Sequence, residues 1–246
     1  MSPTTDRFVP PLIRRLRSTA TLSETVVEAI RTLPVSLRSY EPGQEILRDG
    51  ERPACCLAVV EGWVSRLKFL PGGGRQIIAF HIAGDLPDLQ SLHLGVLDHG
   101  IAALTPCTVA RIPHEALREL SARLPELAAV LWRESMIDAA FFRGWLTANG
   151  RRSAYGRTAH LLCELSLRQR AVGLSTGRTC PMPLRQTDFA DAMGLTSVHI
   201  ARTLGALRKA GLITLQARTL TIHDWDGLCE AAEFDPAYLH LKSVDR

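Results

Sequence analysis

Apolar and polar residues alternate in short runs between residues 38 and 112. The runs CLAVV, WVSRLKFL, RQIIAFHI and TVARI are rich in β-branched residues, and turn signals separate them: EPGQ, RDGERP, VEG and PGGG. Short strands at this spacing are typical of an antiparallel sandwich or roll. Ahead of them, residues 20–33 fit a short helix with Thr21 or Ser23 as its cap. We therefore predict an antiparallel sheet domain preceded by one helix.

The apolar period lengthens between residues 114 and 148, where it fits a helix broken once at Pro125. Val130, Ile137 and Gly144 recur every seven residues, with Phe141 and Ala148 beside them, and Glu134 interrupts the repeat. A helix of this length is either a core helix or the seam of a dimer. The pattern alone slightly favours the core. The small Gly144, which lets backbones approach closely, keeps the seam as an alternative.

The strongest motif spans residues 184–213, LRQTDFADAMGLTSVHIARTLGALRKAGLI. Phe189 and Met193 face inward on a first helix, and Gly194 supplies a tight turn where a side chain would strain the backbone. Thr196 is a good N-cap for a second helix, whose buried face repeats at Ile200, Leu204 and Leu207. This spacing predicts a helix-turn-helix. The alternative is an ordinary helical hairpin, which mimics part of the pattern.

The outward face of the second helix would meet a major groove of DNA; it carries Ser197, Val198, His199, Ala201 and Arg202. The stretch LITLQARTLTIHD then alternates as a two-stranded wing does, with residues 216–218 at its tip. The preceding stretch, VGLSTGRTCPMP, is expected to be a loop. Helix-turn-helix and wing together favour DNA binding over the plain hairpin.

The charged residues are unevenly distributed along the chain, which is consistent with two interpretations. The formal net charge is +4, but residues 41–100 carry eight acidic and five basic residues, whereas residues 143–218 carry twelve basic and three acidic ones. A basic half joined to an acidic half is expected where one part binds a polyanion. The alternative is an ordinary solvated surface in an organism whose proteins are rich in arginine, and composition alone does not decide between the two.

Composition excludes several other classes. With 246 residues and 46% hydrophobic content, the chain can form one large or two ordinary domains, and no apolar run is long enough to cross a membrane. The N-terminus lacks the apolar core of a signal peptide, so a cytoplasmic protein is expected. The six cysteines show no C-x-x-C spacing and are expected to be buried thiols. No nucleophile–base pair, metal-spaced cluster or phosphate loop is visible, so we expect no enzyme, metal or cofactor.

The order of sheet domain, long helix and winged helix-turn-helix resembles the Crp/Fnr family of bacterial transcription regulators, over about residues 20–224. The resemblance rests on Tyr40-x-Pro42-Gly43-x-x-Ile46, Gly50-Glu51, Glu61-Gly62 and Gly84-Asp85 in the roll, and on Thr187-Asp188-x-Ala190, Gly194-Leu195-Thr196 and Arg202-x-Leu204-x-x-Leu207 in the DNA-binding helices. The phrases GRRSAYGRTAHLLCEL and GLTSVHIARTL, with the tail FDPAYL, look like a branch common in alphaproteobacteria.

The resemblance implies an α+β fold: a β-roll sensor domain with an N-terminal helix (residues 1–120), a dimerisation helix and hinge (121–150), and a winged helix-turn-helix domain with a C-terminal tail (151–246). It implies a homodimer that binds a near-palindromic operator in double-stranded DNA, with RNA polymerase as a further partner and no membrane. It also favours the interpretation of the long helix as a dimer seam, which would be formed by Val130, Ile137, Phe141 and Gly144. The expected DNA contacts are Arg185, Gln186, Thr196, Ser197, Val198, His199, Arg202 and Arg218.

Among those contacts, the resemblance assigns base reading to the second helix. Arg202 can bind guanine through two hydrogen bonds, whereas Val198 stands where the family often has a glutamate and could touch only a thymine methyl group. The preferred half-site is therefore expected to differ from the common family sequence.

The effector pocket of the family falls on GDLPDLQSLHLGVLDHG, residues 84–100. Gly84, Asp85, Leu86, Asp98 and His99 are its candidate residues. Cyclic-nucleotide-binding members carry an Arg-Ser pair there, because a phosphate needs charge-assisted donors. No Lys or Arg lies between Arg75 and Arg111, and Asp98 would repel a phosphate. We predict a degenerate cyclic-nucleotide site that is empty or binds another, unknown effector.

Two other sensor types of the family find little support. The iron–sulfur type needs clustered N-terminal cysteines, and the first cysteine here is Cys55; the haem type needs an axial ligand, for which His81, His93 and His99 are the candidates. Since lone histidines are more often structural, we expect no cofactor.

The alternative function is a ligand-sensing module that acts mainly through protein partners and binds DNA weakly. A positive face made by Arg185, Gln186, Arg202 and Arg218 would argue against it.

Overall fold

A computed structural model describes residues 3–242 of the chain, with side chains from residue 7. The chain divides into two compact units, Met1–Phe69 with Ile78–Asp138, and Leu70–Ile77 with Ala139–Arg246. The division falls inside one long helix, α4 (Pro125–Arg151). Each unit is described separately below.

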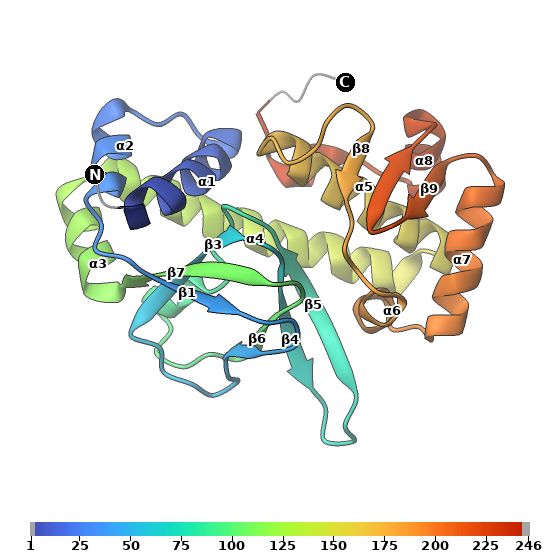
Figure 1. Ribbon diagram of the computed structural model, residues 1–246, viewed down its shortest axis with the longest axis horizontal. Coiled ribbons are helices and arrows are strands. Elements are labelled where there is room, and N and C mark those ends of the chain that lie inside the picture. Colours follow the sequence, from blue (N-terminus) through green and yellow to red (C-terminus); the bar gives the residue numbers. More distant parts are fainter. Residues whose placement is uncertain (1–2, 243–246) are drawn as a thin grey trace. The chain divides into compact units, whose positions relative to one another are not determined.

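Two sheets form from the chain up to residue 113 (Figure 1). In the first, β1 (Ser36–Tyr40) and β3 (Cys55–Glu61) flank β7 (Cys107–Pro113), and both pairings are antiparallel. The second has the order β2-β6-β4-β5, formed by β2 (Glu45–Leu47), β6 (Gly100–Ala103), β4 (Val64–Phe69) and β5 (Arg75–His81). The predicted antiparallel roll is confirmed.

The tight turn at Gly62 explains why the sequence VEG predicted the end of a strand. Gly62 joins β3 to β4 with a φ of +82°, a conformation that other residues rarely adopt. A Cβ atom here would also collide with the carbonyl oxygen of Pro106 and with Cys107. The VEG signal therefore marks a position that only glycine fits.

Helices cover the sheets of the first unit. They are α1 (Pro3–Thr19), α2 (Glu24–Arg31), the short 3-10 helix η1 (Leu89–Leu92) and α3 (His114–Arg123). The helix predicted at residues 20–33 is α2, and Ser23 caps it by accepting a hydrogen bond from Val26 N at 3.3 Å. No pattern anticipated α1, because Pro10 and Pro11 lie inside it and proline usually ends a helix.

The core explains why α1 nevertheless forms. Phe8, Leu12 and Leu16 recur every four residues and are buried in one cluster with Val26 and Ile30 of α2. The burial of a large apolar side chain contributes about 1.5–3 kcal/mol. Tertiary packing therefore outweighs the two prolines.

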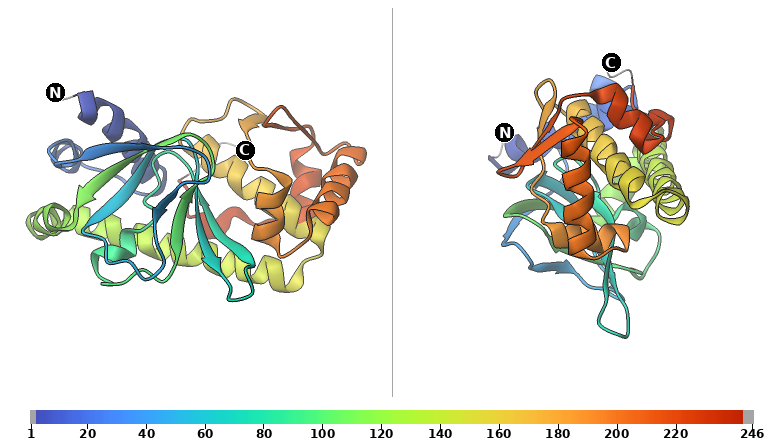
Figure 2. Two further views of the ribbon diagram at one scale, coloured as in Figure 1. Left: turned by 60° about the horizontal axis from the view of Figure 1, so that its bottom comes forward. Right: turned by 90° about the vertical axis from the view of Figure 1, so that its right-hand side faces the viewer.

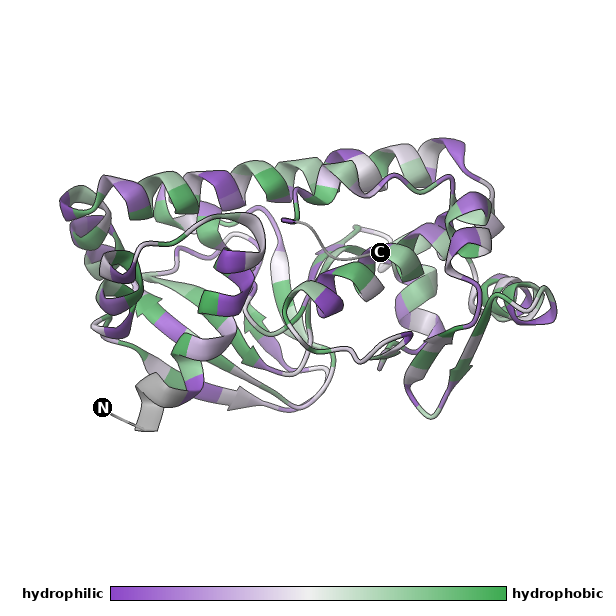
Figure 3. Cartoon of the chain, turned by 90° about the horizontal axis from the view of Figure 1, so that it is seen from above, coloured by the Kyte–Doolittle hydropathy of each residue, from purple (hydrophilic) through white to green (hydrophobic). Residues whose placement is uncertain are grey.

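The helix α4 begins at Pro125, where the sequence predicted a break. Proline is well tolerated at the first position of a helix, since its missing N–H would have no partner there. Polar and apolar bands alternate along this helix in Figure 3. Among the described residues, no helix is long and apolar enough to span a membrane.

The second unit carries the remaining helices around one small sheet. They are α5 (Ala154–Ala171), α6 (Gln186–Met193), α7 (Ser197–Lys209), α8 (Trp225–Ala232) and the 3-10 helix η2 (Pro236–Leu239). The strands β8 (Thr179–Pro181), β9 (Ile213–Gln216) and β10 (Thr219–Ile222) pair in the order β8-β10-β9. Figure 2 shows α6 and α7 beside each other from two directions. The loop expected at residues 172–183 is only partly a loop, because β8 lies within it.

Candidate nucleic-acid interface

The turn between α6 and α7 has the geometry that the sequence predicted. Gly194 is left-handed, with φ 62° and ψ 41°, and the N–H of Leu195 donates to the carbonyl of Ala190 at 3.0 Å. Thr196 caps α7 by accepting a hydrogen bond from His199 N at 3.2 Å. A cap of this type stabilises a helix by about 1 kcal/mol. The start of α7 is therefore fixed by three consecutive residues.

The inward faces of the two helices are packed as the pattern required. Phe189 and Met193 of α6 are buried, as are Ile200 and Leu207 of α7, while Leu204 is only half-buried. The sequence missed Thr203, which is buried because its hydroxyl donates to the carbonyl of His199 at 2.9 Å. That hydrogen bond satisfies the hydroxyl group of Thr203, which would otherwise favour an exposed position.

The outward face of α7 is open. Val198 is 62% exposed, and His199, Ala201 and Arg202 are exposed as well, whereas Ser197 is half-buried. The cap residue Thr196 is also exposed. Small and apolar residues thus surround one long cation, Arg202, which can reach past them toward a ligand.

The wing is the hairpin of β9 and β10, as predicted. Its two-residue turn is Ala217 and Arg218, with φ values of 49° and 60°, so both residues adopt the left-handed conformation that suits a hairpin turn. The carbonyl of Arg218 accepts a hydrogen bond from Met182 N at 2.7 Å, and the Arg218 side chain is exposed. The wing tip is therefore tied by its backbone to the segment that precedes α6.

At the start of α6, Arg185 and Gln186 are both exposed. Arg185 is also engaged within its own helix: Nε and Nη2 donate to the two carboxylate oxygens of Asp188 at 3.1 and 3.0 Å. These hydrogen bonds raise the pKa of Arg185. All residues expected on the positive face are thus accessible to solvent: Arg185, Gln186, Arg202 and Arg218. The guanidinium of Arg185, however, is already paired with the carboxylate of Asp188.

In the candidate effector pocket, Gly84 and Asp85 are buried against the helix α1. Asp85 is buried, and its Oδ1 accepts a hydrogen bond from Nε of Arg15 at 3.0 Å, while its Oδ2 accepts one from Ile82 N at 2.9 Å. Gly84 has a φ of +98°, and a Cβ there would lie 2.5 Å from the carbonyl oxygen of Pro11. The helix α1 therefore packs directly against Gly84 and Asp85, and Leu86 is half-buried.

A second cation enters the same region from β4. Arg66 is 1% exposed; its Nε donates to the carbonyl of Pro87, and its Nη1 lies 2.6 Å from Oδ2 of Asp138 on α4. The stretch 84–100 has no Lys or Arg of its own, as the sequence shows, but Arg15 and Arg66 reach it from other elements. Neither Arg15 nor Arg66 carried a sequence signal, because both come from distant parts of the chain.

Asp98 and His99, the other two candidate residues of the effector pocket, contact each other. His99 is buried, and its Nδ1 lies 2.7 Å from Oδ1 of the exposed Asp98, while its Nε2 lies 3.2 Å from the side-chain nitrogen of Gln90. Burial and the nearby Arg66 lower the pKa of His99. The imidazole is therefore neutral at pH 7, and the hydrogen bond with Asp98 orients it.

A buried polar cluster that the sequence did not reveal lies next to this region. Asp88 is fully buried and accepts a hydrogen bond from Leu57 N at 2.6 Å, and the Ser91 hydroxyl bridges it to His114, 3.0 Å away. Burial raises the pKa of Asp88 to about 7, although the Leu57 N–H acts in the opposite direction. A carboxyl group with this pKa changes its charge near neutrality.

The residues of the predicted dimer seam make contacts within the chain itself. Val130 and Ile137 are buried within the single chain. Phe141 packs edge-on against Tyr238 at 6.1 Å, and a Cβ on Gly144 would lie 3.0 Å from the same ring. Gly144 does permit a close approach, but the neighbour is a tyrosine of its own chain. Glu134 interrupted the repeat because it is a buried ion-pair residue, 2.8 Å from Arg15.

The exposed apolar residues of α4 lie on a different face. Trp132 is 67% exposed, Met136 46% and Leu146 77%, and Phe142 is 39% exposed. Trp132, Met136, Ala139 and Leu146 follow spacings of four, three and seven residues. We call these four residues the α4 stripe. Its heptad period is that of helices that pack against another helix.

Within the described part of the chain, no group of three His, Cys, Asp or Glu side chains is placed to hold a metal ion. Of the histidines considered for haem, His81 is buried 3.7 Å from Asp85, and His93 is exposed.

A roll followed by a capped helix-turn-helix and a wing defines a DNA-binding protein with a sensor-type domain. Comparisons with known proteins agree. The cyclic nucleotide-binding domain family matches residues 37–123, and the Crp-like helix-turn-helix domain family matches residues 156–231. The chain belongs to the Crp/Fnr family of transcription regulators, which are not enzymes.

Individual relatives support the same assignment. The fumarate and nitrate reduction regulatory protein of Escherichia coli K12 is 26% identical over 212 residues, which cover 86% of this chain and 84% of that protein. FixK2 from Bradyrhizobium japonicum has a similar structure, with a TM-score of 0.74, 25% identity, and coverage of 81% of this chain and 98% of that chain. The c-di-GMP responsive regulator CLP of Xanthomonas campestris shares the fold, with a TM-score of 0.64, 16% identity, and coverage of 82% and 100%.

Proposed function

We propose that this regulator acts as a homodimer whose two α7 helices read a near-palindromic operator, with Arg202 as the principal base-reading residue. The observation that carries the proposal is the open face of α7. On it, the exposed Arg202 lies one turn beyond the exposed Val198, on a helix whose start is fixed by Gly194 and Thr196. A forked guanidinium at this place suits the O6 and N7 atoms of guanine in a major groove. Val198 suits a thymine methyl group.

The wing and the start of α6 supply contacts of another kind in this proposal. Arg218 projects from a hairpin turn, and Gln186 stands at the first turn of a helix, where N–H groups favour an anion. We assign both to phosphate contacts, which position the protein on any DNA sequence. Arg185 contributes less than its exposure implies, because Asp188 already binds its guanidinium.

The dimer in this proposal forms through the α4 stripe. Trp132 and Leu146 are the most exposed large apolar side chains of α4, and an uncovered patch of this kind is costly in water. A second copy of the same helix would cover it with an isologous contact, as closed dimers do. Crp/Fnr regulators act as dimers on DNA, and the exposed apolar side chains of the α4 stripe support this contact.

The roll, in the same proposal, does not bind a cyclic nucleotide in the usual way. A nucleotide needs a cation for its phosphate and acceptors for its hydroxyl groups. Arg66 is already held by Asp138 and Pro87, and Asp85 by Arg15 and Ile82. A nucleotide would have to break these buried contacts before it gained its own, so we infer that the site is occupied by the protein's own side chains or takes another effector.

The test is selection of bound DNA from random duplexes with the full-length protein. The proposal predicts an enriched, near-palindromic site with half-sites about one helical turn apart. Guanine should occur at one fixed position in each half-site. Enrichment of single, unpaired half-sites would contradict the dimer, and no enrichment at all would contradict sequence-specific reading.

A further inference from the structure

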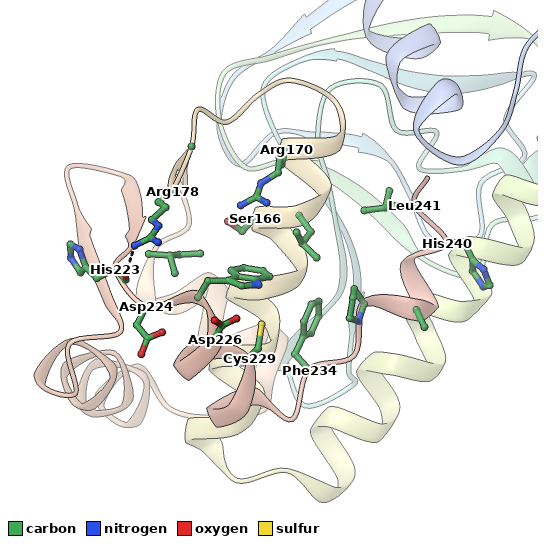
Figure 4. Close-up of a pocket in the computed structure, with 16 residues that line it drawn as sticks. Ser166, Arg170, Arg178, His223, Asp224, Asp226, Cys229, Phe234, His240 and Leu241 are labelled. Carbon is green, nitrogen blue, oxygen red and sulfur yellow. Dashed lines mark hydrogen bonds between the residues drawn. The ribbon is translucent and has the colours of Figure 1, made fainter. Parts of the chain in front are cut away.

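An open cavity of about 1170 Å³ lies in the second unit, between α5, α8 and the short helix η2 (Figure 4). Its walls also include Ile222, at the end of the wing strand β10, and Arg178, directly before β8. Small-molecule sites in proteins typically have volumes of about 300–1,000 Å³, so this cavity has room for a ligand. Among the described residues that line it, none is an expected DNA contact.

Trp225 and Phe234 form an aromatic wall of the cavity. Their rings meet edge to face, with centroids 6.3 Å apart and an interplanar angle of 84°. Both residues are only half-buried. The flat ring of a ligand can therefore pack against them in the offset or edge-on arrangements that aromatic groups prefer.

The guanidinium of Arg170 lies over the same wall, 5.8 Å from the centre of the Trp225 ring. A second guanidinium, that of Arg178, donates through Nη1 to the carbonyl of His223 at 2.8 Å. Both arginines line the cavity. A guanidinium presents several N–H groups in a planar fork, which suits the two oxygens of a carboxylate. The cavity thus places a carboxylate-binding group next to an aromatic surface.

The two carboxylates that line the cavity belong to the start of α8. Asp224 caps this helix, since its Oδ1 accepts a hydrogen bond from Gly227 N at 2.9 Å, and Asp226 lies in the first turn. The N–H groups at the start of a helix stabilise negative charge. These carboxylates therefore stabilise α8, and the charge on a ligand that suits the arginines of the cavity is negative.

We propose that this cavity binds a small aromatic carboxylate. The carboxylate group pairs with the guanidinium of Arg170, and the ring packs against Trp225 and Phe234. All the described residues that line the site come from the second unit, so it is separate from the candidate effector pocket at residues 84–100. The inference does not rest on base reading by Arg202, and its test contains no DNA.

The test is titration calorimetry of the full-length protein with 2-naphthoate as the probe. We expect saturable binding of a single 2-naphthoate per chain with a dissociation constant below about 1 mM, which a ligand of this size reaches at ordinary efficiency. Naphthalene-2-carboxamide has the same ring but no charge, so it should bind roughly ten- to a hundredfold more weakly. Absence of saturable binding at millimolar 2-naphthoate, or equal affinities for the two probes, would overturn the proposal.

Protection of Cys229 locates the bound ligand, because this half-exposed residue lines the cavity. Its alkylation by iodoacetamide, followed by mass spectrometry of the peptides, should slow by about tenfold when 2-naphthoate is present at ten times its dissociation constant. Cys55 is the internal control, since it is also half-exposed but belongs to the first unit, and its alkylation rate should not change. Equal rates for Cys229 with and without 2-naphthoate would place the ligand outside the cavity.

Variants assign the roles within the site. Arg170→Gln should weaken 2-naphthoate binding roughly ten- to a hundredfold and leave the carboxamide unaffected, because it removes only the charge. Trp225→Leu should weaken the binding of both probes. Arg208→Gln is the matched control, since Arg208 is exposed on α7 and does not line the cavity, and it should bind as the wild type does. Circular dichroism checks that each variant folds. Wild-type affinity in a folded Arg170→Gln protein would show that Arg170 does not hold the carboxylate.

Discussion

Arg15 and Asp85 form a buried ion pair, with Nε of the arginine 3.0 Å from Oδ1 of the aspartate. The same guanidinium lies 2.8 Å from Oε2 of Glu134, so one cation neutralises carboxylates from two other elements of the first unit. Both carboxylates are at most 8% exposed. The pair therefore fastens α1 to the roll at the position where a ligand-binding residue was expected.

Replacement of Arg15 should destabilise the first unit strongly. Arg15→Met keeps most of the apolar volume but leaves Asp85 and Glu134 without their cation, which costs about 3–5 kcal/mol when a buried pair is broken. The measurement is the free energy of unfolding in urea. Arg7→Met is the matched control on the same helix, because Arg7 pairs with Glu61 at 3.2 Å in an exposed position and should contribute less than about 1 kcal/mol. Equal losses in the two variants would contradict the role of Arg15.

The fully buried Asp88 should make stability fall as pH rises toward neutrality. Its folded pKa is about 7, against an ordinary value of 3.8, so the folded chain holds this proton more tightly than the unfolded chain. The resulting stabilisation is complete below about pH 4 and is lost as the pH passes 7, in total about 4 kcal/mol. Asp88→Asn stays neutral throughout. The difference in unfolding free energy between wild type and variant should therefore change between pH 4 and 7 and level off above; a difference that does not vary with pH would show that Asp88 does not titrate in this range.

Local patterns predicted much of this fold because local chemistry determines it. The turn at Gly194, the cap at Thr196 and the start of α4 at Pro125 each depend on residues adjacent in sequence. The apolar period located the buried faces of α6 and α7 for the same reason. A pattern in one helix thus predicts which face is buried whenever that face is continuous.

Long-range contacts account for what the sequence could not predict. The helix α1 forms because it packs on the roll in spite of two prolines, and Arg15 and Arg66 reach the pocket from other elements. The seven-residue repeat on α4 falls on residues that the chain itself buries, fully at Val130 and Ile137 and partly at Phe141 and Gly144. Sequence period alone does not say which of two apolar faces meets a partner.

A carboxylate on the α4 stripe should dissociate the dimer. Leu146→Glu places a charge on a side chain that is 77% exposed in the protomer, so the protomer should fold normally while a partner helix would bury the charge at a cost of several kcal/mol. Sedimentation at micromolar concentration should show monomers. Arg151→Glu is the control, since Arg151 is exposed on the same helix but off the stripe, and it should remain dimeric. A fully dimeric Leu146→Glu protein would place the interface elsewhere.

Cyclic AMP and cyclic GMP should bind weakly or not at all. The charged groups that such ligands need are paired within the protein: Arg66 with Asp138, and Asp85 with Arg15. Titration calorimetry of the full-length protein should detect no binding at micromolar nucleotide. Micromolar or tighter affinity for either nucleotide would show that these internal contacts yield to a ligand.

Base reading by Arg202 is tested by the ratio of the affinities for the selected operator and for a scrambled duplex. Loss of a two-bond guanine contact costs about 1–3 kcal/mol, so Arg202→Ala should weaken operator binding by roughly ten- to a hundredfold and scrambled binding much less. Arg218→Ala, at the wing tip, should weaken both together and flatten the salt dependence, as expected for a phosphate contact. If Arg202 reads a base, this ratio falls in Arg202→Ala and stays constant in Arg218→Ala; an unchanged ratio in Arg202→Ala would show that Arg202 does not read a base.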